Sequence, residues 1–151
     1  GCDIGFSELL RAGEISHLPR LFAAQPEHCA PLHATFLSGA DTLATIDARP
    51  TLAEGTSIER PIRWRDVLGA IRRSHGQTVA ISEAEIEASH EALARAGFYV
   101  EPTCATADAA LARLLDAGVI TADQTTVVVL TGSGLKATQR IGELMGALPG
   151  A

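Results

Sequence analysis

The segment at 131–136 is the part of the sequence whose residue types most directly suggest ligand binding. An apolar run is followed there by Thr131, Gly132, Ser133, Gly134, Leu135 and Lys136. The two glycines let the backbone approach a ligand closely, and the two hydroxyls can donate or accept hydrogen bonds. A tight turn explains the same residues equally well. The spacing fits neither a phosphate-binding P-loop, which ends in Gly-Lys-Ser/Thr, nor a nucleophile elbow, which reads Gly-x-Ser-x-Gly.

Two carboxylates lie at further positions where a ligand could bind. Glu101 follows a short apolar stretch and precedes Pro102, a residue suited to the first turn of a helix. A carboxylate there also complements the helix dipole, which by itself is a sufficient explanation. Glu54 and Gly55 lie in a long loop at 42–60. Loops of that length in compact domains are often functional, although an ordinary surface turn also accounts for these two residues.

Other side chains with chemical potential have ordinary structural explanations. The spacing of His28, Cys29 and His33 matches no standard zinc pattern, and no second cluster completes four ligands, so we expect no metal site. His90 falls on the apolar face of a helix and is expected to be a core histidine. Lys136 is the only lysine of the chain. It invites a Schiff-base role, but a surface charge near a loop explains it as well.

The elements that must position these residues alternate between strands and helices. We expect strands at 20–25, 77–81, 98–100 and 125–130, and helices at 6–12, 29–37, 61–75, 83–96, 103–117 and 138–148. Ser82 and Glu85 have the spacing of a capping box. The inward residues of the helices should include Ile86, His90, Leu93, Ala107, Ala110, Leu111, Leu114 and Leu115.

This alternation predicts the α/β class, with a mostly parallel sheet and helices on both faces. The run at 125–130 is the most apolar of the strands, so we expect a central strand covered on both faces.

Composition narrows the class of protein. The chain has 151 residues, a net charge of -6, 46% apolar and 20% charged residues. These values fit a single α/β domain at 1–151 with its own core, and exclude a disordered tail. An acidic chain is a poor nucleic-acid binder, and no apolar run approaches the roughly 20 residues of a membrane helix. The odd number of cysteines predicts free thiols in a reducing cytoplasm. The absence of an initiator Met suggests a piece of a longer chain.

Taken together, these segments resemble the C-terminal half of threonine synthase-like enzymes, which belong to the fold type II group of pyridoxal-phosphate enzymes. The resemblance covers residues 5 to about 136 and is carried, in the order and at the intervals of the family, by TLAEG at 51–55, PIRW at 61–64, GFYVEPTCA at 97–105 and VLTGSGLK at 129–136. The last of these motifs is the most specific, and it favours threonine synthase over the related dehydratases.

The resemblance implies that one wall of a cofactor site is formed by Thr131, Gly132, Ser133, Gly134, Glu101, Glu54 and Gly55. Thr131 would face the pyridine nitrogen of pyridoxal phosphate, where a neutral hydroxyl tempers the electron sink. The three residues after it would shape the wall beside the ring, with Glu101 near the same wall. Glu54 and Gly55 would border the ring or the substrate. Thr56 and Cys104 depart from the family, which commonly has an apolar residue and a small Ser or Ala there, and both departures bear on substrate identity.

The resemblance also implies that this chain lacks catalytic parts. In the family, the Schiff-base lysine lies in the N-terminal half, and the glycine-rich loop for the cofactor phosphate lies just before the point where this chain starts. Lys136 corresponds to the lysine of the closing motif, so no residue here is assigned a catalytic role. We therefore expect the isolated chain to be inactive without the missing N-terminal half of the same enzyme.

The parent would be a cytoplasmic homo-oligomer that converts a small amino-acid substrate, O-phosphohomoserine, to threonine. The alternatives are a fragment of a threonine or serine dehydratase-like enzyme, and a non-catalytic ligand-binding module of the same fold. Neither nucleic acid nor a membrane is an expected partner.

Overall fold

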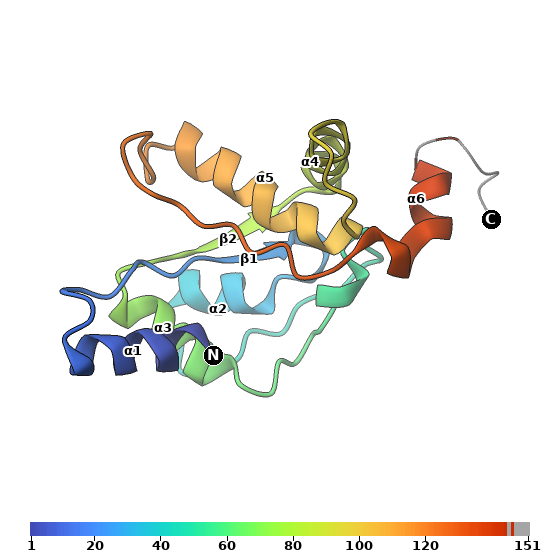
Figure 1. The fold of residues 1–151 in the computed structure, drawn as a ribbon. Coiled ribbons are helices and arrows are strands. Elements are labelled where there is room, and N and C mark those ends of the chain that lie inside the picture. The colour runs from blue at the N-terminus through green and yellow to red at the C-terminus, as the bar shows by residue number, and fades with distance from the viewer. Residues whose placement is uncertain (145, 147–151) are drawn as a thin grey trace.

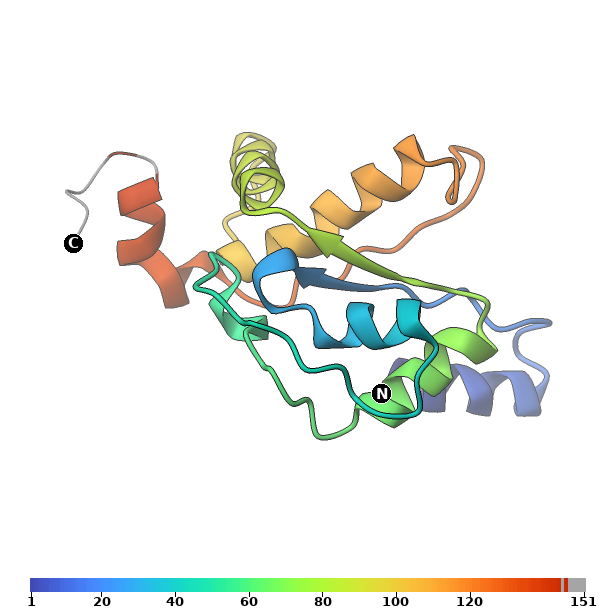
Figure 2. The same ribbon diagram turned by 180° about the vertical axis from the view of Figure 1, so that it is seen from behind.

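A two-stranded parallel sheet lies at the centre of the computed structural model, which describes residues 1–144 and 146 (Figure 1). Strand β1 (Ala23–Pro26) pairs with β2 (Thr78–Ile81). Helices α2 (Pro31–Ser38) and α3 (Trp64–Arg73) lie on one side of the sheet, and α4 (Glu83–Arg95) and α5 (Pro102–Asp116) on the other (Figures 1 and 2). The predicted α/β class, with helices on both faces of a parallel sheet, is confirmed.

The remaining helices lie around this centre. Helix α1 (Cys2–Ala12) buries none of its residues and is joined to α3 by an ion pair between Asp3 and Arg73 at 2.7 Å. The described residues also form three short 3-10 helices, η1 (Glu27–Cys29), η2 (Glu54–Thr56) and η3 (Gly134–Ala137). Helix α6 (Thr138–Leu144) follows η3 and projects away from the sheet (Figure 1). No helix in the described part of the chain is long and apolar enough to cross a membrane.

The main core fills the space between the sheet and the α4–α5 pair. Its members, all buried, are Ala53, Val79, Ile81, Ile86, Leu93, Val100, Cys104, Ala105, Ala109, Ala110, Leu114 and Ile120. A smaller cluster of Leu32, Leu68 and Ile71 holds α2 and α3 together on the side of the sheet opposite α4 and α5. His90 is buried and its Nε2 lies 3.0 Å from the Val100 carbonyl oxygen, as expected for a core histidine. Leu115, expected to point inward, is instead exposed.

The prediction of a central strand at 125–130 is wrong. Val127 is 80% exposed and Val129 60% exposed, whereas Val128 and Leu130 are partly buried. This alternation shows an extended segment with one covered face, not two. A strand also needs a neighbour for its backbone N–H and C=O groups. The one isolated bridge in the described residues pairs Val100 with Ser133, and it is all that remains of the strand predicted at 98–100.

Other element boundaries differ by a few residues. Strand β1 begins at Ala23, not at 20, and includes Pro26 as its last residue. Helix α3 begins only at Trp64, after a turn at 61–63. The helix predicted at 138–148 is present from Thr138 to Leu144; residues 145, 147 and 148 of the predicted range lie outside the described residues.

Candidate functional site

Glu101 and Gly132 lie in direct contact although they are 31 positions apart in the sequence. The Glu101 N–H donates to the Gly132 carbonyl oxygen at 3.2 Å, and the Gly134 N–H donates to the Tyr99 carbonyl oxygen at 3.0 Å. A Cβ at position 132 would lie only 1.9 Å from Glu101 Oε1. Position 132 therefore accepts only glycine while the Glu101 side chain keeps its place, which explains why a glycine-rich segment runs along this carboxylate.

Cys104 holds the same glycine from the first turn of α5. Its Sγ accepts the Gly132 N–H at 3.1 Å and lies 3.4 Å from the Gly132 carbonyl oxygen, as a donor to it. Sγ is also 3.9 Å from Thr131 Oγ1, which places this buried thiol behind the Thr131 hydroxyl. Thr131 itself is exposed, so its hydroxyl can reach a ligand. Ser133 Oγ accepts the Leu135 N–H at 3.3 Å and so caps η3.

Glu54 and Gly55 lie in η2, which contacts the start of α5. The Gly55 N–H donates to Thr103 Oγ1 at 3.2 Å, and a Cβ at position 55 would lie 3.0 Å from the same oxygen. Glu54 is exposed beside it. The long loop that contains these residues is thus attached to the helix that begins just after Glu101.

An open cavity of about 480 Å³ lies where these segments meet. It is lined by Leu52, Glu54, Gly55, Glu101, Pro102, Thr103, Lys136, Ala137, Thr138, Gln139, Arg140 and Glu143. Three of the predicted site residues, Glu54, Gly55 and Glu101, therefore share one cavity with Lys136. The segment at 131–134 does not line the cavity; Gly132 and Gly134 are buried against Glu101 and Tyr99 beside it. The assignment of these residues to a cofactor stays a prediction.

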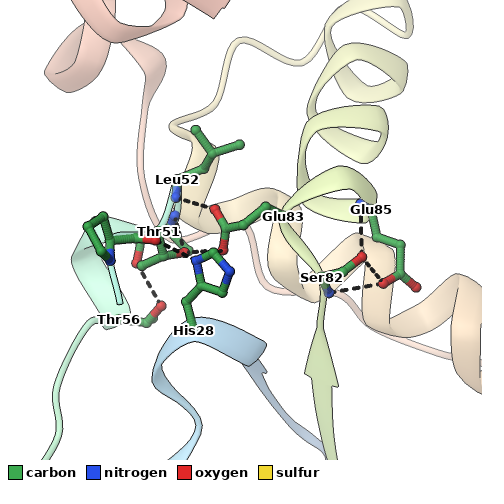
Figure 3. A network of polar contacts seen from close by, with 9 residues as sticks. His28, Thr51, Leu52, Thr56, Ser82, Glu83 and Glu85 are labelled. Atoms are coloured by element: carbon green, nitrogen blue, oxygen red, sulfur yellow. Dashed lines mark hydrogen bonds and ion pairs between the residues drawn. The ribbon is translucent and has the colours of Figure 1, made fainter. Parts of the chain in front are cut away.

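Glu83, which no sequence motif indicates, fixes the loop that contains Glu54. From the first residue of α4, its carboxylate accepts hydrogen bonds from the Thr51 hydroxyl and the Leu52 N–H, at 2.7 and 2.6 Å (Figure 3). His28 Nδ1 lies 3.6 Å from Glu83 Oε1. No sequence spacing indicates this network, because Glu83 lies 31 and 32 residues from its two loop partners. Glu83 has only the ordinary signature of an acidic first turn.

The start of α4 is held by a second, separate carboxylate. Glu85 completes the capping box with Ser82 and pairs with Arg113 of α5 through Nη2 at 2.5 Å and Nε at 3.0 Å. Partial burial raises the pKa of Glu85, but the hydrogen bonds from Ser82 and Arg113 outweigh it and hold this pKa below its usual range. Arg113 thereby ties α5 to the start of α4.

The histidines and cysteines near β1 do not converge on a metal. Among the residues that the structure describes, no group of three His, Cys, Asp or Glu side chains is placed to hold an ion. His33 Nδ1 lies 3.0 Å from Thr78 Oγ1, and burial is the main cause that lowers the His33 pKa. All three cysteines are unpaired, with Cys2 exposed and Cys29 and Cys104 buried.

Comparison with solved structures shows the same fold in known enzymes. A threonine synthase from Escherichia coli aligns over 85% of this chain and 29% of its own, with a TM-score of 0.67 and 17% identity. A serine racemase from maize aligns over 85% of this chain and 39% of its own, with a TM-score of 0.58 and 15% identity. A solved threonine deaminase aligns over 87% of this chain and 45% of its own, with a TM-score of 0.62 and 21% identity.

Sequence comparison gives closer relatives. The chain is 35% identical over 138 residues to the threonine synthase of Methanosarcina acetivorans, covering 91% of this chain and 34% of that protein. It is 33% identical over 133 residues to the threonine synthase of Methanocaldococcus jannaschii, covering 87% and 33%. The chain thus spans about a third of the length of these relatives, and the predicted resemblance to threonine synthases is confirmed. Since residues 1–132 also match the family model for pyridoxal-phosphate dependent enzymes, the chain belongs to that family.

Proposed function

We propose that this chain is the C-terminal part of a threonine synthase-like lyase that converts O-phosphohomoserine to threonine with pyridoxal phosphate. The observation that carries the proposal is the identity of 33–35% to threonine synthases over about nine tenths of the chain. The four motifs of the resemblance lie within the aligned length. The chain would supply one wall of the site, and the N-terminal half of the same enzyme would supply the other.

The residues on this wall fit one side of the cofactor. Thr131 is exposed, whereas Gly132 and Gly134 are buried against the side chains of Glu101 and Tyr99. Thr131 is therefore the residue among these three that can contact a bound ring. When bound, pyridoxal phosphate supplies the electron sink for carbanion chemistry. The Thr131 hydroxyl would hydrogen-bond the ring nitrogen as a neutral partner. The Cys104 thiol, which lies 3.9 Å from that hydroxyl and accepts the Gly132 N–H, would help to position it.

The cavity beside this wall suits an anionic amino acid. Lys136 lines it with an ammonium group that can attract a carboxylate or phosphate, whereas Glu54 and Glu101 can attract an amino group. Lys136 is the only lysine in the chain. We assign it to this electrostatic role and not to covalent attachment of the cofactor, so the isolated chain is expected to be catalytically silent.

Exposed apolar side chains support the proposal that another segment of the same enzyme covers this part of the chain. Val127 and Val129, and Leu135 at 78% exposure, lie along the segment that leads into the site. Large apolar side chains exposed along one segment are candidates for an interaction surface. The occupant we propose is the N-terminal half of the same enzyme, since this chain spans about a third of the length of its relatives.

A chimeric enzyme tests the proposal. The matching 138-residue segment of the Methanosarcina acetivorans threonine synthase would be replaced by this chain, and the purified protein assayed with O-phosphohomoserine and with threonine. Formation of threonine and inorganic phosphate is the expected result. Formation of 2-oxobutanoate from threonine would instead indicate a dehydratase, and a folded chimera without either activity would indicate a non-catalytic module. A Lys136→Arg chimera is the control: it keeps the charge and should stay active.

A further inference from the structure

The carboxylate of Glu83 accepts its hydrogen bonds from a loop and not from its own helix. Glu83 is the first residue of α4, directly after the N-cap Ser82. Its Oε1 accepts the Thr51 hydroxyl at 2.7 Å, and its Oε2 accepts the Leu52 N–H at 2.6 Å (Figure 3). Hydrogen bonds to a carboxylate at these distances are short and strong. The two ends of this contact belong to elements about 30 residues apart, so it is a tertiary link.

The start of α4 does not depend on this link. The Ser82 N–H donates to Glu85 Oε2 at 2.9 Å, and the Glu85 N–H donates to Ser82 Oγ at 3.4 Å. Arg113 then holds Glu85 from α5. Loss of the Glu83 carboxylate would therefore leave the helix with its cap and its contact to α5, and would affect mainly the loop.

The hydrogen bonds continue from Thr51 toward the cavity. The Ala53 N–H donates to Thr51 Oγ1 at 3.1 Å, and the Thr56 hydroxyl donates to the Ala53 carbonyl oxygen at 3.0 Å. Thr51 and Ala53 are both buried, and Ala53 belongs to the main core. The residues between Ala53 and Thr56 are Glu54 and Gly55, so the rim of the cavity is a turn closed by these bonds.

His28 supports the same network from η1. Its Nδ1 lies 2.5 Å from the carbonyl oxygen of Pro50 and 3.6 Å from Glu83 Oε1 (Figure 3). On the far side of the turn, the Gly55 N–H reaches Thr103 Oγ1 on α5. The rim is thus fixed at two points, by Glu83 before Glu54 and by Thr103 after it.

We propose that Glu83 is a positioning residue, which fixes Glu54 and Gly55 at the rim of the cofactor and substrate site by binding Thr51 and Leu52. The identity of that site rests on the proposed function, whereas the network itself is a property of this chain. Glu54 and Gly55 line the cavity, and a loosened rim must be ordered again each time substrate binds, so loss of the Glu83 contacts should weaken substrate binding.

Amide hydrogen exchange in this chain tests the network without any activity. Glu83→Gln keeps the side-chain size but offers one amide oxygen as an acceptor in place of two carboxylate oxygens. The Leu52 and Ala53 amides should then exchange about tenfold to a hundredfold faster, with unchanged exchange along α4. Glu87→Gln, an exposed carboxylate one turn further along α4, is the matched control and should change neither. Thr51→Val, which removes the shared hydroxyl, should speed exchange at Ala53 in the same way.

The chimeric enzyme gives the functional readout. Glu83→Gln should raise KM for O-phosphohomoserine by about tenfold, with kcat altered less than about threefold, because binding and not chemistry is affected. Unchanged exchange at Leu52 and Ala53, or faster exchange along all of α4, would overturn the inference. A fall of about tenfold in kcat with an unchanged KM would also overturn the inference. If the unsubstituted chimera forms no threonine, the proposed function fails, and the exchange result still decides whether Glu83 holds the rim.

Discussion

Replacing Gly132 with alanine tests the packing of the candidate wall. The new Cβ would lie 1.9, 2.2 and 2.7 Å from three successive atoms of Glu101. To reach ordinary contact at 3.4 Å, the carboxylate must retreat by about 1.5 Å. The glycine cannot move away, since its N–H and carbonyl oxygen bind Cys104 and the Glu101 N–H. Its φ lies outside the left-handed region, so the penalty is purely steric. We expect a loss of about 1–3 kcal/mol in unfolding free energy, typical of overpacking.

Urea denaturation, followed by circular dichroism, measures this loss. Gly5→Ala is the control: nothing lies within 4 Å of its Cβ position in α1, so a gain of up to about 1 kcal/mol is expected. Glu101→Ala should rescue Gly132→Ala by removing the clashing atoms, with a coupling energy of about 1–3 kcal/mol. If Gly132→Ala unfolds like the wild type, or if Glu101→Ala gives no rescue, the described contact is refuted.

Four further predictions concern the rest of the chain. A Cβ at Gly76 would lie 1.8 Å from the Leu21 carbonyl oxygen, a backbone atom that cannot rotate away, so Gly76→Ala should cost at least about 3 kcal/mol by the same urea assay; a cost below about 1 kcal/mol would contradict the close approach. Burial lowers the pKa of His33, so the unfolded chain binds a proton at His33 more readily than the folded chain does. The difference stabilises the fold fully above about pH 6.5, and this stabilisation is lost as the pH falls below that value. A pH series of unfolding free energies should show the loss in the wild type and not in His33→Gln. Glu85, whose pKa is held low, contributes stability above about pH 4.3 that is lost as the pH falls further. In Glu85→Gln, the unfolding free energy should no longer fall with pH in this acidic range. The exposed Val127 and Val129 predict that the isolated chain self-associates in analytical ultracentrifugation, and a monodisperse monomer with a cooperative high-temperature melt would contradict this.

Features that depend on neighbouring residues in the sequence were predictable. The Ser82–Glu85 capping box is confirmed because both of its hydrogen bonds join residues three apart. The helices expected at 83–96 and 103–117 end within one residue of the predicted positions, at Arg95 and Asp116. Gly97 and Gly118, which follow them, have φ values of +91° and +65° that suit glycine. The alternation of strands and helices was enough to predict the α/β class.

Features that depend on distant residues were not. The apolar run at 125–130 has the composition of a central strand, but whether it becomes one depends on neighbouring strands, and Val127 and Val129 are exposed instead. Only the family resemblance predicted that Glu101 lies near the segment at 131–134, because no sequence spacing indicates this contact. The Glu83 network was missed for the same physical reason: an acidic residue in a first turn reads the same whether it faces solvent or a loop.

The most direct test of the central claim is to locate covalent attachment of the cofactor. The claim is that this chain supplies a wall of the site and that Lys136 does not bind pyridoxal phosphate covalently during catalysis. The isolated chain would be incubated with pyridoxal phosphate, reduced with borohydride and digested to map the adduct, with threonine formation measured in parallel. We predict no stoichiometric adduct on Lys136 and no threonine from O-phosphohomoserine. A stoichiometric adduct on Lys136 together with turnover would contradict the account.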